Sequence, residues 1–131
     1  AVAGTVNLIF ERDLAATLAC FSEDVRYSVN LDAEVPFSGT TDNKTDLARR
    51  LAIILDMFDF LARVVETVSV DGDDVRAKVL FYYRHKLSGD ILDSRYRLVC
   101  RVENGSIVSA DAYYDAAMFE TFLRLTSRNA P

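Results

Sequence analysis

The side chains best suited to chemistry stand at alternate positions in the second half of the chain. Tyr83 and His85 close one alternating stretch, Ser94 and Tyr96 belong to the next, and Tyr114 ends a third. A phenol or hydroxyl can donate a hydrogen bond to a carbonyl or hydroxyl oxygen, and an imidazole can exchange a proton near neutral pH. Because alternate residues of a strand share one face, we expect these side chains to line a common small-molecule site.

Each of these residues also has a purely structural interpretation, and both stay open. Glu66 interrupts an apolar alternation, and a carboxylate in apolar surroundings has a raised pKa that suits a general base. A glutamate on an edge strand, however, more often reaches solvent. Asn30 stands at the end of a predicted strand, where an asparagine more often stabilises a turn than holds a water. His85 favours a place on the rim or surface over that of a general base, and the tyrosines can be core residues.

Composition excludes several classes of function. The chain has 131 residues, of which 50% are hydrophobic, and a formal net charge of -5. A net negative charge opposes nucleic-acid binding, and no apolar run reaches the about 20 residues of a membrane helix or forms a signal peptide. Cys20 and Cys100 lie in apolar segments without a CxxC pair, and there is one histidine, so a disulfide or zinc site is not expected. We predict a cytoplasmic protein with no cofactor, no metal and no membrane or nucleic-acid partner.

The first half of the chain reads as helical with one strand. Apolar residues at helical spacing predict short helices over 2–10 and 13–21, and a strand follows over 25–31. A loop with Pro36 and Gly39 leads to an amphipathic helix over 43–58.

The second half alternates with period two, which predicts a meander of antiparallel strands. A strand over 62–70 has Ala62, Val64, Val68 and Val70 on its apolar parity, and in the next strand, over 75–87, the odd positions are the core face. The apolar parity then changes to even positions, so a two-residue loop at Ser88-Gly89 is expected, with Arg84 opposite Asp93.

The last hairpin turns at Glu103-Asn104-Gly105. A two-residue turn would mix the faces, so we predict a three-residue loop with a left-handed Gly105. Its register places Tyr96 opposite Ala112, which leaves room for a ligand beside a phenol, and Arg97 opposite Asp111. A short helix over 116–125 ends the pattern.

Helices followed by a long antiparallel meander make an α+β fold. Three segments, ERDLAATLACFSEDVRYSV, PFSGTTDNKTDLARRL and VRAKVLFYYRHKLSGDILDSRYRLVCRVENGSIVSADAYYDAAMF, resemble the nuclear transport factor 2-like superfamily, in its branch of SnoaL-like polyketide cyclases, ketosteroid isomerases and limonene epoxide hydrolases. The resemblance implies one domain over residues 1–131. It also implies a cone-shaped α+β barrel, in which a curved, mostly antiparallel sheet wraps the N-terminal helices around an apolar pocket.

The catalytic groups of these relatives do not carry over to this chain. The resemblance places the hydrogen-bonding acid of the isomerases at Leu98, and the Asp-Arg-Asp group of the epoxide hydrolases at Phe81, Val79 and Ala112. Asn30 alone matches, as the asparagine that helps those hydrolases to hold water. None of these mechanisms is intact.

We therefore expect a protein that binds a small hydrophobic molecule, as an isomerase, cyclase or hydrolase acting by acid/base chemistry, or as a non-catalytic ligand-binding or dimerisation module. Whether it is an enzyme stays open. The candidate catalytic residues are Tyr96, Tyr114, Asn30, Glu66 and His85, and the candidate ligand-binding residues are Val79, Phe81, Tyr83, Ser94, Leu98, Ala110 and Ala112.

A homodimer through the outer face of the sheet is also expected. That face mixes aromatic and aliphatic side chains with arginines and acids, as interfaces do. Its residues are Leu80, Tyr82, Val99 and Tyr113 among Arg84, Arg95, Arg97, Asp93 and Asp111.

Overall fold

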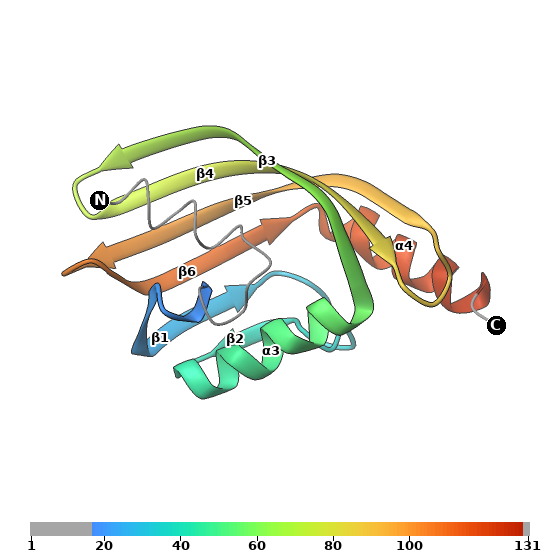
Figure 1. The fold of residues 1–131 in the computed structure, drawn as a ribbon, viewed down its shortest axis with the longest axis horizontal. Coiled ribbons are helices and arrows are strands. Elements are labelled where there is room, and N and C mark those ends of the chain that lie inside the picture. Colours follow the sequence, from blue (N-terminus) through green and yellow to red (C-terminus); the bar gives the residue numbers. More distant parts are fainter. Residues whose placement is uncertain (1–16, 130–131) are drawn as a thin grey trace.

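The computed structural model describes residues 17–129 as a curved mixed sheet with two helices (Figure 1). The elements are β1 (Phe21–Val29), β2 (Gly39–Thr41), α3 (Lys44–Met57), β3 (Phe58–Asp71), β4 (Asp74–His85), β5 (Ile91–Glu103), β6 (Ser106–Tyr114) and α4 (Ala116–Asn129). The strand order is β2-β1-β6-β5-β4-β3, and the pairing is antiparallel except between β1 and β6. The predicted α+β class is confirmed.

The helices expected over 2–10 and 13–21 lie almost entirely outside the described residues. Phe21, assigned to the second of them, instead begins β1, so the strand predicted over 25–31 starts and ends earlier than expected.

Helix α3 closes the cone. It follows β2 at one edge of the sheet, precedes β3 at the other, and contacts both strands as well as β1. Its apolar side faces inward, with Leu47 and Ile54 buried. A space enclosed by one face of the sheet and one helix is the consequence.

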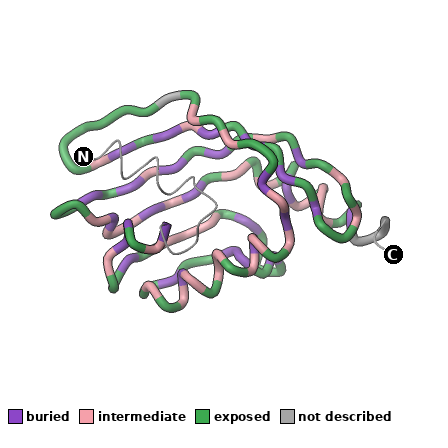
Figure 2. Tube along the Cα trace, viewed as in Figure 1, coloured by how far each residue is buried: buried purple, intermediate pink, exposed green. Residues whose placement is uncertain are grey.

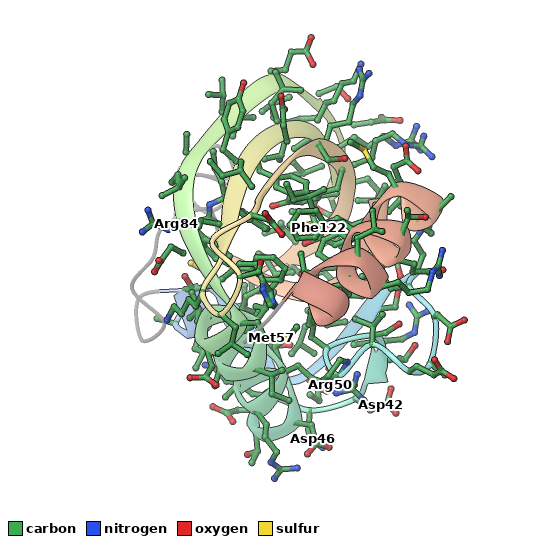
Figure 3. All side chains as sticks on the ribbon, turned by 90° about the vertical axis from the view of Figure 1, so that its right-hand side faces the viewer. Asp42, Asp46, Arg50, Met57, Arg84 and Phe122 are labelled. Atoms are coloured by element: carbon green, nitrogen blue, oxygen red, sulfur yellow. The ribbon has the colours of Figure 1, made fainter. Side chains whose placement is uncertain are left out.

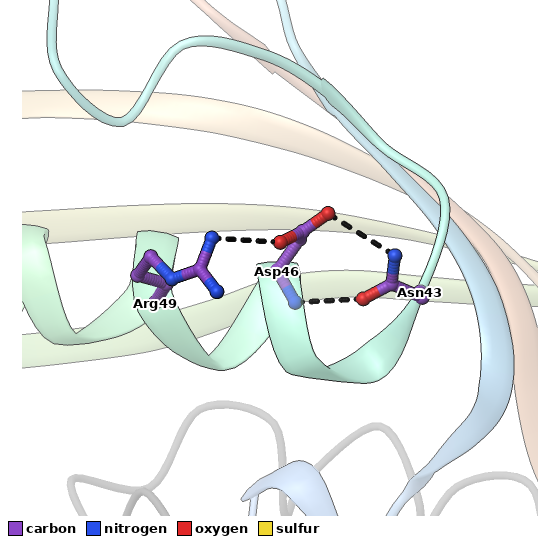
Figure 4. A network of polar contacts seen from close by, with 3 residues as sticks. All are labelled: Asn43, Asp46 and Arg49. Carbon is purple, nitrogen blue, oxygen red and sulfur yellow. Dashed lines mark hydrogen bonds and ion pairs between the residues drawn. The ribbon is translucent and has the colours of Figure 1, made fainter.

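The start of α3 is fixed by a local network (Figure 4). Oδ1 of Asn43 accepts the backbone N–H of Asp46 at 2.9 Å, and Nδ2 of Asn43 donates to Oδ2 of Asp46 at 3.1 Å. Arg49 donates to the other carboxylate oxygen at 2.9 Å. Asn43 is the N-cap and Phe58 the C-cap, so the helix predicted over 43–58 is confirmed.

The residues of β3 that face inward are not the ones expected from the sequence. Its pairing with β4 shifts between Phe60 and Ala62 and again between Val65 and Thr67, which marks two β-bulges. Each bulge adds one residue and reverses the alternation, and it also bends the strand, as β3 does in Figure 1. Val64, expected on the core face, is 56% exposed. The residue that turns inward is Arg63, which lies opposite Phe81.

The hairpin between β4 and β5 has the expected faces but a register shifted by two residues. Its last pair is Arg84 with Ile91, and the chain turns through a longer loop in which the N–H of His85 donates to the carbonyl of Asp90 at 2.8 Å. The expected pairing of Arg84 with Asp93 is therefore wrong. Arg84 instead donates to Asp59 on β3 at 2.9 Å.

The last hairpin also differs from the expectation. Gly105 is left-handed as predicted, but Asn104 is as well, so the turn has two residues, between Glu103 and Ser106. A bulge one pair further along restores the faces that this short turn would otherwise mix. The resulting register pairs Tyr96 with Tyr114, Leu98 with Ala112 and Arg97 with Tyr113, so the predicted pairs of Tyr96 with Ala112 and Arg97 with Asp111 are wrong.

Asp111 faces the β1 side instead. It accepts a hydrogen bond from Ser28 and lies 3.7 Å from Arg26.

Burial alternates along the central strands, as Figure 2 shows. The inward positions of β4 are buried from Val75 to His85, whereas Leu87 beyond the strand is 72% exposed. Aromatic rings dominate this core: Phe119 contacts Phe58 and Phe81, with centroid distances of 5.9 and 6.4 Å. The sheet therefore offers a rigid aromatic wall behind the space that α3 encloses.

Candidate functional site

A cavity of about 80 Å³ lies between α3 and the inner face of the sheet. Helix α3 contributes an apolar side, and strands β1, β3, β4, β5 and β6 contribute most of the polar groups. The lining residues are Thr17, Tyr27, Val29, Phe37, Arg50, Leu51, Ile54, Leu55, Phe60, Arg63, Tyr83, Tyr96 and Tyr114. Among these described residues there is no aspartate, glutamate or histidine.

Four phenols meet in this cavity. The rings of Tyr96 and Tyr114 are 4.7 Å apart, because the two residues are cross-strand partners on β5 and β6. The ring of Tyr83 stacks on Phe60 at 4.2 Å and lies 4.1 Å from Phe81. Packing against neighbouring rings fixes these side chains and aims polar groups at one space.

Burial keeps the phenols protonated. It raises the pKa of Tyr96 to about 12, against the opposing effects of the Arg63 charge and of hydrogen bonding to Arg63. Burial likewise raises the pKa of Tyr83, Tyr114 and Tyr27, and Tyr96 adds to the rise in all three because like charges would repel. At neutral pH the cavity therefore holds hydrogen-bond donors rather than phenolates.

Two arginines accompany the phenols. The guanidinium of Arg63 lies over the ring of Phe60, with Cζ 4.9 Å from the centroid. Its charge and its hydrogen bonds partly offset the rise in the pKa of Tyr83 and Tyr96. Arg50 comes from α3, on the side of the helix that Figure 3 shows near Asp42. The described lining is thus apolar, rich in donors and positively charged.

Of the five candidate catalytic residues, the structure brings Tyr96 and Tyr114 together in the cavity and leaves the other three out of its lining. Glu66 lies at the second bulge of β3, where it is exposed, and its Oε2 is 3.9 Å from Nζ of Lys78. Asn30 is exposed at the end of β1 and bonds the backbone of Tyr114.

His85 lies at the end of β4 as expected but is buried, with 8% exposure. Its Nδ1 is 3.0 Å from Oγ of Ser88 and accepts the N–H of Ser88 at 3.3 Å, so the imidazole holds the loop after β4. The imidazole of His85 also lines a second hollow, of about 360 Å³, between the 32–36 loop and α4. This is the end of the molecule that faces the viewer in Figure 3, where Met57 and Phe122 are labelled.

Of the expected ligand-binding residues, only Tyr83 lines the cavity. Ser94, paired with Phe81, is half-buried and outside its lining. The others are buried core side chains outside this lining: Val79, Phe81, Leu98, Ala110 and Ala112.

Sequence reasoning missed Tyr27 and Arg63 as lining residues. Tyr27 alternates with Val25 and Val29, so a period-two pattern that could have identified it was present. Arg63 had no such signal, because the bulge that turns it inward is invisible in the pattern.

Comparisons with solved structures show the fold. A nuclear transport factor 2-like protein from Burkholderia thailandensis E264 superposes with a TM-score of 0.78 at 20% identity, over 93% of each chain. A protein from Jannaschia sp. CCS1 described as a SnoaL-like polyketide cyclase gives 0.76 at 16% identity, over 98% of this chain and 92% of that one. A protein with a ketosteroid isomerase-like fold from Catenulispora acidiphila DSM 44928, in complex with trimethylamine, gives 0.72 at 15% identity, over 84% of each.

Two other results bound the assignment. A search of curated proteins found no significant match. In the part of the chain that the structure describes, neither helix has the length and the apolar run needed to cross a membrane.

The SnoaL-like domain family matches residues 2–110, most of the chain. With the same fold in the cyclase-like and isomerase-like proteins above, this match shows that the chain belongs to the SnoaL-like domain family, a family of cyclases and isomerases.

Proposed function

We propose that the cavity binds a small hydrophobic molecule through a carbonyl or hydroxyl oxygen, and that its phenols supply the acid side of acid/base chemistry. The observation that carries the proposal is the convergence of Tyr27, Tyr83, Tyr96 and Tyr114 on one cavity beside Arg63. Donors fixed in a buried, rigid site stabilise negative charge that develops on a substrate oxygen.

The cavity volume limits the ligand. An engineered cavity of about 150 Å³ accepts benzene, so the about 80 Å³ between α3 and the sheet suits a ligand no larger than a single six-atom molecule of that kind. A small cyclic ketone such as cyclopentanone is therefore a suitable probe, with methylcyclopentane as the probe of equal size without the oxygen.

Proton exchange tests the acid/base role. If the phenols stabilise the enolate, the protein should accelerate exchange of the α-protons of cyclopentanone with deuterated water, measured by NMR. Tyr96→Phe should slow this exchange by about 10²-fold. Tyr82→Phe is the matched control, because Tyr82 is 47% exposed on the outer face and outside the cavity lining.

A second function, a non-catalytic binding module, is favoured by one observation: the described lining holds no carboxylate or imidazole that could accept a proton. Binding of cyclopentanone in preference to methylcyclopentane, without acceleration of exchange, would select this function. Binding of neither probe at the cavity would contradict both.

A further inference from the structure

Arg63 is placed in the cavity by two independent features of the chain. The bulge after Phe60 turns it toward the inner face opposite Phe81, and its guanidinium lies over the ring of Phe60, which itself stacks on Tyr83. A side chain held in this way is oriented before any ligand arrives.

The described part of the chain does not use all of the hydrogen-bonding capacity of Arg63. Nη2 of Arg63 is buried and has no hydrogen-bond partner among the described residues. Among the ion pairs of residues 17–129, which join surface side chains such as Arg84 and Asp59, none includes Arg63.

A buried guanidinium donor without a partner costs free energy, and arginine cannot relieve the cost by losing its proton. Apart from Arg63, the groups that shift the pKa of Tyr83 and Tyr96 are other phenols and the thiol of Cys100. These groups are neutral at physiological pH. Among residues 17–129, the cavity therefore holds a positive charge without a matching negative one.

We propose that the ligand of this cavity is a small apolar anion with its charge on oxygen, a carboxylate or an enolate, and that Arg63 is its counter-charge. This inference rests on the proposed function and narrows its ligand class. One oxygen would accept from Nη2 of Arg63, while Tyr83 and Tyr96 donate to the remaining lone pairs. Arginine suits this role because its planar donors match a carboxylate.

The test compares two probes of equal size and shape, isobutyrate and isobutyramide, by NMR titration of the isotope-labelled protein. The unmodified protein should bind isobutyrate at least about 30-fold more tightly than the neutral amide, with shifts at residues lining the cavity. Arg63→Met should remove this preference by weakening isobutyrate binding far more than amide binding, and Arg63→Lys should retain part of it. Arg76→Met, which removes an exposed arginine of β4, should change neither.

Thermal stability separates this role from a structural one. Replacing an unpaired buried charge with an apolar side chain of similar length should raise the melting temperature of the free protein, whereas loss of a structural contact would lower it. Equal affinity for the two probes in the unmodified protein, whatever the variants do, would overturn the inference. If cyclopentanone still binds in that case, the proposed function stands; if no probe binds, it fails too.

Discussion

Asn30 holds Tyr114 by its backbone. Oδ1 of Asn30 accepts the N–H of Tyr114 at 2.8 Å, and Nδ2 donates to its carbonyl at 3.0 Å. The parallel pairing of β1 with β6 ends with Val29 opposite Ala112, so the side-chain amide continues the ladder where the main chain of β1 leaves it. An amide suits this place because it both donates and accepts.

We predict that Asn30→Ala lowers the free energy of unfolding by about 1–2 kcal/mol, since two backbone groups lose their partner. Because Tyr114 lines the cavity, ligand binding should weaken with it. Urea unfolding and probe titration measure the two effects. Asn30→Asp keeps the acceptor and should fall between; equal stability of all three proteins would show that the contact contributes nothing.

Above about pH 10 the protein should lose stability as the pH rises. Burial raises the pKa of Tyr96 from 10.0 to about 12, so the folded state keeps a proton that the unfolded chain releases. The free energy of unfolding is therefore unaffected by titration of this group below about pH 10. Between about pH 10 and the pKa of Tyr96 in the folded protein, it falls by about 1.4 kcal/mol per pH unit for each such phenol. Urea titrations between about pH 9 and 11 should give a shallower slope for Tyr96→Phe. An identical slope would contradict the assignment.

The cap of α3 should contribute measurably. Asn43→Ala removes the acceptor for the N–H of Asp46 and should cost about 1 kcal/mol, whereas Asn43→Ser should preserve most of the stability. Arg49→Ala removes only an exposed ion pair and should cost at most about 0.5 kcal/mol. A larger loss in Arg49→Ala than in Asn43→Ala would contradict this account of the helix start.

Local signals in the sequence were sufficient for α3 and for the faces of β4 to β6. Asn43 caps α3 by accepting the N–H of Asp46, three residues further along the chain. The inner and outer faces of a strand can be predicted from its own alternation, without reference to the neighbouring strands. The strand registers and the cavity could not be predicted from local signals. They depend on bulges in β3 and β6 and on the loop after His85, each of which is decided by tertiary packing. The first bulge of β3 turns Arg63 inward, whereas uninterrupted alternation along the sequence predicted that Glu66 would face inward.

The protein should catalyse neither ketosteroid isomerisation nor limonene oxide hydrolysis above background. By the resemblance to those families, Leu98, Val79, Phe81 and Ala112 take the positions of their acids and arginine, and all four are buried apolar residues outside the cavity lining. Each missing group contributes about 10²-fold or more in rate. Turnover of either substrate that is carried by the pure protein and falls in Tyr96→Phe would prove this wrong.

The outer face of the sheet carries the features of a self-association surface. Tyr82, Tyr113 and Leu80 are exposed there at 47, 42 and 37%, and Arg97 covers the ring of Tyr113 with its Cζ 5.6 Å from the centroid. Exposed aromatic and aliphatic groups beside arginines are typical of interfaces, and a twofold axis would place the same patch on both partners.

We therefore predict a homodimer through this face. Light scattering at micromolar concentration should give about twice the chain mass of 14.7 kDa. Tyr82→Glu would place a desolvated charge at the centre of the contact and should yield a monomer with an unchanged cavity, because Tyr82 points away from it. Leu87→Glu is the matched control, since Leu87 is exposed in the loop after β4 and beyond the paired strands. A mass near 14.7 kDa for the unmodified protein would reject the dimer, and dissociation by both variants would show that the contact lies elsewhere.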